Sequence, residues 1–381
     1  MKHFKLFFLL ILTAGLPAEK TTAQTIAQST PDKLPTWALG PFLRPAGVNP
    51  IISPNTSTTF LDPLSGKYVD WESNDTFNPA ATVKGKEIVV LYRAEDKSGV
   101  GIGHRTSRLG YAYSTDGLTF KRKSEPVFYP GNDNQKELEN PGGCEDPRIA
   151  VTSDGTYVMF YTQWNKKVAR LGVATSKDLI KWTKHGPAFA KAYNGKFYDM
   201  FTKSASIVTK LVNGKQIIAK VNGKYLMYWG EKFLNAATSD DLINWAPALD
   251  EKGNIKELIK PRRNYFDSDL TEAGPPALLT DKGILVLYNG KNASGDRSDK
   301  NYTANTYAAG QVLFDAKNPE KVIARLDKPF FVPTESFEKS GQYPAGTVFV
   351  EGLIFHQKKW FLYYGCADSK VAVAVFDPSK K

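Results

Sequence analysis

The feature that most constrains the fold is a repeat with a period of about 60 to 76 residues. A β-rich run that ends at or near a tyrosine occurs five times. The five tyrosines are Tyr92, Tyr161, Tyr228, Tyr288 and Tyr364. Repeats of this length, built of short strands, predict an all-β protein and in particular a five-bladed β-propeller. A β-sandwich is the alternative, but it would not explain the long period.

A second segment repeats three times, starting at Leu109, Leu171 and Leu234, which are 62 and 63 residues apart. Each copy reads as a strand, a Ser-x-Asp turn and an aromatic residue that opens the next strand. In a propeller the innermost strands of all blades converge on one channel. Polar residues that are far apart in the sequence are therefore expected to line one pocket.

The N-terminus predicts export. Residues 1–23 read as a secretory signal, with Lys2 and Lys5 before an apolar run and small residues after it. Residues 24–40 read as a linker and residues 41–381 as a single propeller domain. No later stretch approaches the roughly 18 apolar residues of a membrane-spanning helix. We therefore expect a secreted, periplasmic protein without a membrane span.

The formal charge of +11 raises the question of a polyanionic partner. The lysines are mixed with acidic residues and their longest clusters are pairs, which predicts a solvated surface and no nucleic-acid partner. No cluster of histidine and cysteine suggests a metal, and no phosphate-binding loop suggests a cofactor. The two cysteines, Cys144 and Cys366, could form a disulfide or remain as packed free thiols.

Carboxylates carry the clearest signal for chemistry. Glu145 and Asp146 stand between two glycines and Pro147-Arg148, just before a strand-like run. Adjacent residues of a regular strand point to opposite faces, so we expect only one of the two carboxylates to face a site. A structural turn, with Asp146 capping backbone N–H groups, is the alternative.

The other units also place polar residues beside glycine or proline at strand ends. The four histidines lie in no motif, so there is no sign of a Ser-His-Asp set. Several carboxylates together with many aromatic residues are typical of glycoside cleavage, in which one carboxyl protonates the leaving oxygen and another activates water or attacks the sugar.

Taken together, these motifs resemble glycoside hydrolase family 130, the β-mannoside phosphorylases and β-mannosidases, from about Gly40 to Ala374. The matching stretches include Phe77-Asn-Pro-Ala, Tyr92-Arg, Ser107-Arg, Glu145-Asp-Pro-Arg, Asn222-Gly-Lys-Tyr, Gly274-Pro-Pro, Gly310-Gln and Gly365-Cys-Ala-Asp. The resemblance implies a five-bladed propeller, inversion at the sugar carbon and a manno-oligosaccharide substrate. It also implies that Asp146 is the general acid, acting through the mannose 3-hydroxyl, and that Asn78, Arg93 and Asp368 grip the mannosyl unit.

The departures from the phosphorylase pattern favour hydrolysis. Where those enzymes have His-Arg, with the arginine holding phosphate, this chain has Gly230-Glu231, and Glu272 precedes the Gly-Pro-Pro turn. At about 4 Å and an effective dielectric of about 20, each carboxylate would cost a bound phosphate charge about 4 kcal/mol. This resembles the branch that hydrolyses β-1,2-mannosides, with Glu231 and Glu272 orienting water and one of them acting as the base.

Further candidates for substrate binding are Arg108, Arg148, Lys203, Tyr228 and Asn289. Arg108 and Arg148 could equally be structural partners of carboxylates, and Lys203 matches the phosphate region of the phosphorylases. A β-mannoside phosphorylase and a non-catalytic glycan-binding propeller therefore remain as alternatives. The sequence does not indicate the oligomeric state.

Overall fold

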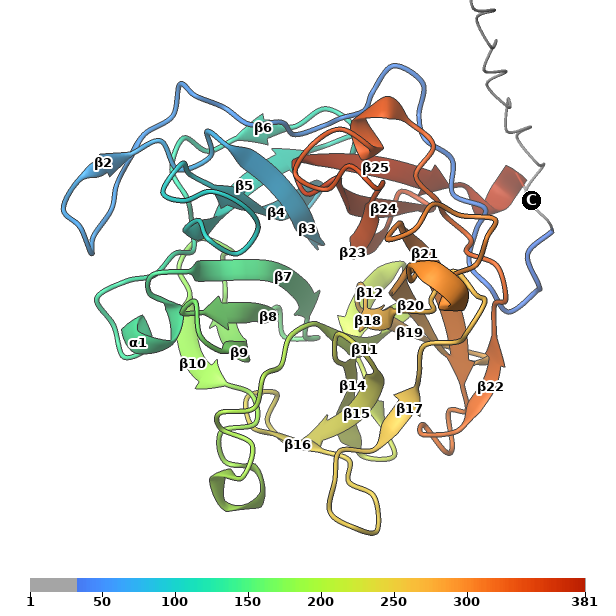
Figure 1. Ribbon diagram of the computed structural model, residues 1–381. Helices are drawn as coiled ribbons and strands as arrows, with labels where there is room; N and C mark the ends of the chain where they lie inside the picture. The colour runs from blue at the N-terminus through green and yellow to red at the C-terminus, as the bar shows by residue number, and fades with distance from the viewer. Residues whose placement is uncertain (1–32, 381) are drawn as a thin grey trace, which may run out of the picture. The chain divides into compact units, whose positions relative to one another are not determined.

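The repeats fold into antiparallel meanders of short strands, as Figure 1 shows for a computed structural model of the protein. The structure describes residues 33–380, and the chain from Leu34 onward forms one compact unit. The predicted signal, and the predicted linker up to residue 32, lie outside the described residues.

The first half of the unit contains two meanders. They share one sheet, because β5 meets β7 in parallel at Ser107 and Gly143. Their strands are β3 (Asp75–Lys84), β4 (Glu87–Glu95) and β5 (Ser107–Ser114), then β7 (Gly143–Val151), β8 (Tyr157–Trp164), β9 (Ala169–Ser176) and β10 (Thr183–Pro187).

The second half begins with a larger sheet, in which β11 and β19 pair in parallel. Its main strands are β11 (Ala205–Val212), β14 (Lys224–Trp229), β15 (Leu234–Ser239), β16 (Trp245–Pro247), β18 (Leu270–Ala273), β19 (Ala277–Thr280), β20 (Gly283–Lys291), β21 (Tyr307–Phe314) and β22 (Val322–Arg325). A last sheet contains β23 (Val348–His356), β24 (Lys359–Cys366) and β25 (Lys370–Phe376).

The remaining elements are short and lie on the connections. The strands among them are β1 (Phe60–Leu61), β2 (Tyr68–Val69), β6 (Lys121–Arg122), β12 (Lys215–Ile218), β13 (Lys220–Val221) and β17 (Glu257–Ile259). The helical turns are α1 (Lys136–Glu139), η1 (Ala192–Gly195), η2 (Gly295–Arg297), η3 (Ser336–Glu338) and η4 (Pro378–Lys380). The expectation of an all-β protein is thus confirmed.

Hydrophobic clusters lie between successive meanders and also between the last and the first. Val90 and Tyr92 of β4 pack in one cluster with Tyr363 of β24 and Val373 of β25. The meanders therefore close into a ring, with β3, β7, β11, β18 and β23 towards its middle (Figure 1). Burial of these apolar faces is the main term that holds neighbouring sheets together.

The predicted Ser-x-Asp turns are confirmed. In the second copy, Asp178 Oδ1 accepts the backbone N–H groups of Ile180 and Lys181 at 2.9 and 2.8 Å. Asp116 and Asp241 make the same bonds in the other two copies. An aspartate that satisfies backbone donors in this way fixes the turn between two strands.

Four of the five repeated tyrosines donate their hydroxyl to a buried carboxylate. The acceptors of Tyr92, Tyr161, Tyr288 and Tyr364 are Glu72, Glu139, Asp267 and Glu338. Each acceptor is also paired with a cation, namely Arg122, Lys184, Arg325 and Arg44 respectively. Many of the carboxylates in the repeats therefore stabilise the fold, and only a separate set converges at the middle of the ring.

Candidate active site

The site is organised around an irregularity in β7. The register of β7 against β8 shifts between Glu145 and Arg148, and Asp146 has a positive φ of 47°. A bulge of this kind redirects side chains. As a result, Glu145 and Asp146 both reach the same arginine, Arg93 of β4. The strand is not regular here, so the expectation that only one of the two carboxylates faces the site is wrong.

Arg93 is the centre of this cluster. Its Nη1 donates to Asp146 Oδ1 at 3.0 Å, and its Nη2 donates to Glu145 at 2.8 Å and Glu95 at 2.6 Å. Asn78 of β3 donates from Nδ2 to the same Asp146 oxygen at 2.9 Å. Asn78 also has a positive φ, at a register shift in β3. Three of the predicted site residues are thus held together.

These contacts give Glu145 and Asp146 very different pKa values. Burial raises the pKa of Glu145 to about 7, although Arg93 opposes this. Burial would also raise the pKa of Asp146, but Arg93, Lys203 and Arg148 outweigh it and lower that pKa to about 2. Asp146 is therefore ionised at neutral pH. As a general acid it would have to gain a proton during the reaction.

A second cluster forms around Lys203, in the connection before β11. Its Nζ lies 3.0 Å from Glu231 and 3.6 Å from Glu272 of β18. Ser204 donates to Glu272 at 2.5 Å. Burial raises the pKa of Glu272 to about 7, while Lys203 opposes the shift. Glu272 is almost fully buried, whereas the Glu231 side chain is 35% exposed.

The charged groups of the two clusters interact electrostatically. Burial alone would lower the pKa of Lys203, but Glu272, Glu231 and Asp146 together raise it well above its usual value. Asp368, between β24 and β25, interacts with the same charged groups. Burial raises its pKa to about 7, Arg93 opposes the rise and Asp146 adds to it. The structure thus gathers Asp146, Lys203, Glu231, Glu272 and Asp368, as the sequence predicted.

Three predicted residues make other contacts. Arg108 pairs with Asp62 and Asp96 at 2.6 and 2.7 Å. Tyr228 is buried, stacks on Phe314 and donates to the carbonyl of Pro319 at 2.7 Å. Asn289 is buried and uses its amide on the backbone of Val350. The polar atoms of these residues thus bind other parts of the fold.

Sequence reasoning missed two residues at the site. Glu351 of β23 is fully buried, 2.9 Å from Arg148. A single carboxylate inside an apolar run was the available signal, because buried carboxylates are normally paired or functional. Tyr307 is the second. Its pKa is raised by Glu272 and Asp368 and lowered by Lys203. Its ring packs against Tyr343 and Phe349. Nothing local in the sequence distinguishes this tyrosine from the others.

Within residues 33–380, no group of three or more histidine, cysteine or acidic side chains could hold a metal ion. The cysteines Cys144 and Cys366 are buried free thiols, which answers the question that their spacing left open. Over the same residues, no helix has the length and apolar character needed to cross a bilayer.

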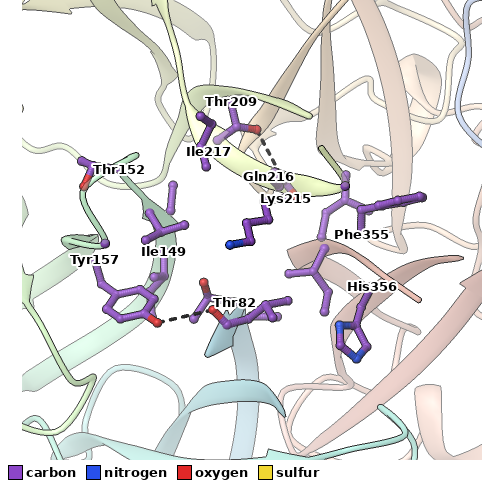
Figure 2. Close-up of a pocket in the computed structure, with 18 of the residues that line it drawn as sticks. Thr82, Ile149, Thr152, Tyr157, Thr209, Lys215, Gln216, Ile217, Phe355 and His356 are labelled. Atoms are coloured by element: carbon purple, nitrogen blue, oxygen red, sulfur yellow. Dashed lines mark hydrogen bonds between the residues drawn. The ribbon is translucent and has the colours of Figure 1, made fainter. Parts of the chain in front are cut away.

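A cavity of about 380 Å³ lies at the other ends of the same strands. Residues 81–83 of β3, 149–151 of β7 and 353–356 of β23 contribute to it. Figure 2 shows Lys215 and His356 in its wall beside Thr82, Ile149 and Phe355. None of the described residues that line it is acidic, and none belongs to the clusters described above.

Comparisons with known proteins identify the family of the chain. A family model described as beta-1,4-mannooligosaccharide phosphorylase matches residues 49–380. A 1,2-beta-oligomannan phosphorylase from Thermoanaerobacter sp. (strain X514) is 34% identical, with 81% of this chain and 92% of that protein covered.

Two solved structures are more similar. A glycosyl hydrolase from Bacteroides ovatus is 66% identical with a TM-score of 0.90, covering 92% of this chain and 98% of that one. Another is 64% identical with the same TM-score, covering 91% and 96%. It accompanies the finding that the family of mannoside phosphorylases contains glycoside hydrolases that target β-1,2-mannosidic linkages in Candida mannan. The chain therefore belongs to glycoside hydrolase family 130, whose members cleave β-mannosides.

Proposed function

We propose that this protein is an inverting β-1,2-mannosidase that hydrolyses manno-oligosaccharides. The observation that carries the proposal is the placement of Lys203 between Glu231 and Glu272. With both carboxylates ionised, this trio has a net negative charge, which disfavours a phosphate dianion and favours a bound water. At an effective dielectric of about 20, one such charge at about 4 Å disfavours a phosphate charge by about 4 kcal/mol.

In the proposed reaction, Asp146 delivers a proton to the bridging oxygen as its bond to the sugar carbon breaks. Water attacks the same carbon from the opposite face and gives its proton to a carboxylate. Glu231, which is partly exposed, and Glu272, whose pKa near 7 suits a base, are the candidates for that carboxylate. Asn78, Arg93 and Asp368 surround Asp146 and would hold the mannosyl unit.

The proposal includes the finer architecture and the location. The ring of meanders is proposed to be a five-bladed propeller, one blade for each repeated tyrosine, with the core cluster between the last and first meanders as support. Residues 1–23 are proposed to be a cleaved export signal and the mature chain to be periplasmic. Fractionation of the native host, with N-terminal sequencing that starts near Gln24, would test the second point.

The alternative is phosphorolysis, supported by Lys203 and by the 34% identical relative, which is named as a phosphorylase. The test is incubation with β-1,2-mannobiose, with and without inorganic phosphate, and a readout of mannose and mannose 1-phosphate. Hydrolysis predicts mannose at the same rate in both tubes. Formation of mannose 1-phosphate only when phosphate is present would replace the proposal by the alternative.

A further inference from the structure

The pair Arg148–Glu351 lies in the middle of the ring and joins two strands that are distant in sequence. Arg148 belongs to β7 and Glu351 to β23, and Arg148 Nη1 lies 2.9 Å from Glu351 Oε1. Neither side chain has measurable exposure. Burying such a pair carries a desolvation cost that can exceed the Coulomb attraction, so stability alone is a weak reason for its presence.

Arg148 donates hydrogen bonds to two backbone carbonyls, one at the proposed acid and one beside a candidate base. Its Nη1 donates to the carbonyl oxygen of Asp146 at 2.8 Å, and its Nη2 donates to the carbonyl oxygen of Ala273 at 3.1 Å. Ala273 directly follows Glu272 in β18. One rigid guanidinium thus connects the backbone beside the proposed acid to the backbone beside a candidate base.

The backbone next to Glu351 is fixed by a register shift and by hydrogen bonds with Asn289. The register of β23 shifts between Val350 and Gly352, which brackets Glu351. Asn289 binds both polar groups of Val350: Nδ2 donates to its carbonyl at 3.2 Å and Oδ1 accepts its N–H at 2.7 Å. Both Glu351 carboxylate oxygens lack a hydrogen-bond partner among the described residues, and Oε1 is engaged by the ion pair with Arg148.

We propose that Glu351 is a positioning residue that orients Arg148, and that this pair sets the separation of Asp146 and Glu272. The inference rests on the proposed roles of those two carboxylates. The charged groups that face Glu351 are Arg148 and Asp146 of β7, Glu272 of β18 and Arg93 of β4; burial raises the pKa of Glu351 well above its usual value, and Arg148 opposes this shift. Without the contact to the Glu351 carboxyl group, the guanidinium is free to turn towards the other carboxylates and both backbone bonds loosen.

The test is Glu351→Gln, which keeps the size of the side chain and replaces the carboxyl oxygen that faces Arg148 by a neutral amide. We expect kcat on β-1,2-mannobiose to fall about 10- to 100-fold, because a displacement of about 1 Å at reacting groups has effects of this order. KM should change less than about threefold, since the groups that bind the sugar stay in place. The limb of the pH–rate profile near pH 7 should move to lower pH, because the unbalanced arginine favours ionised Glu272.

A matched control is Glu338→Gln, which removes an equally buried carboxylate from the ion pair with Arg44. It should lower the unfolding temperature without changing kcat or the pH profile of the folded enzyme. Arg148→Lys cannot bind both carbonyls, so it should lose more activity than Glu351→Gln. The double variant should be no worse than Arg148→Lys alone if the two residues act as one unit.

A folded Glu351→Gln enzyme with wild-type kcat and pH profile would overturn the proposal. If that variant does not fold, Glu351→Asp decides: it withdraws the carboxylate from Arg148 by one methylene, and wild-type turnover there would equally overturn it. All rates are taken relative to wild type on whichever product wild type forms. The phosphate dependence of wild type tests hydrolysis separately, so the two failures are distinguishable.

Discussion

The two ends of the inner strands are built from the same chain segments but differ in regularity and charge. At the site end, β3, β7 and β23 each change register, at Asn78, Asp146 and Glu351. Beyond these points the pairing is regular, as in Ile149 opposite Met159. That regular end lines the cavity in Figure 2 with hydroxyl, amide, aliphatic and aromatic groups, together with Lys215 and His356, and without a carboxylate from the described residues.

The largest described hollow and the buried carboxylates thus lie at opposite ends of the same strands. The cavity of about 380 Å³ offers space. Its charged side chain Lys215 is exposed to solvent and is not held by a buried carboxylate of the described lining. The site end instead holds three buried carboxyl groups whose pKa values burial raises to about 7, together with Asp146, whose pKa is about 2. Environments that push the pKa values of neighbouring carboxyl groups apart mark candidates for acid and base roles. For Asp146 to act as the acid and Glu272 as the base, the order of these values has to be reversed in the complex with substrate.

The largest effect is expected for Asp146→Asn at the site end. Loss of the proton donor should lower kcat by about 10²- to 10⁴-fold, the range for general acid–base catalysis. The variant keeps the hydrogen-bonding shape beside Arg93 and should remain folded, as circular dichroism would show. Turnover close to wild type would mean that Asp146 is a structural residue.

Glu231→Gln and Glu272→Gln should each reduce turnover by about a hundredfold or more, because either change removes an acceptor for the proton of water. The larger loss identifies the base. The measurement is the initial rate of mannose release from β-1,2-mannobiose. Wild-type rates in both variants would remove the water site from the proposal and return attention to Lys203 as an anion site.

The pH dependence separates these two carboxylates. If Glu272 is the base, kcat/KM should rise with pH up to about 7 and fall by about tenfold per pH unit below it. In Glu272→Gln this limb should disappear from the residual activity. A limb that persists there points to Glu231, or to another carboxyl such as Asp368, for which Asp368→Asn is the comparison.

The same raised pKa has a consequence for stability. The folded protein binds a proton at Glu272 more tightly than the unfolded chain does, where the pKa is 4.5. Its stabilising contribution is therefore complete below pH 4.5 and is lost as pH rises through about 7. Thermal unfolding against pH should show a shallower decline over this window in Glu272→Gln than in wild type.

The smallest effect is expected at the cavity end. Lys215→Ala should leave kcat and KM unchanged and alter the free energy of unfolding by less than about 0.5 kcal/mol, because the side chain is exposed. A loss of turnover there would break the contrast between the two ends. It would mean that the hollow in Figure 2 takes part in catalysis or in substrate access.

Local patterns in the sequence determined the strands and the turns, and they showed which carboxylates lie near strand ends. The Ser-x-Asp turns follow from short-range hydrogen bonds, and the repeated tyrosines mark strands that the structure confirms. Asp146 could be singled out from its strand-end motif, whereas the roles expected for Lys203, Glu231 and Glu272 came from the resemblance to family 130 and the departures from its phosphorylase pattern.

Only the tertiary structure decided which of these side chains meet and in what state. A shift of one residue in register reverses the direction of a side chain, and no local signal revealed the shifts at Asp146 and Glu351. The pKa of about 2 at Asp146 arises from Arg93 of β4, Lys203 in the connection before β11 and Arg148 beyond the bulge in β7. Such long-range placement depends on closure of the ring, because charges interact strongly only once burial has removed the water between them.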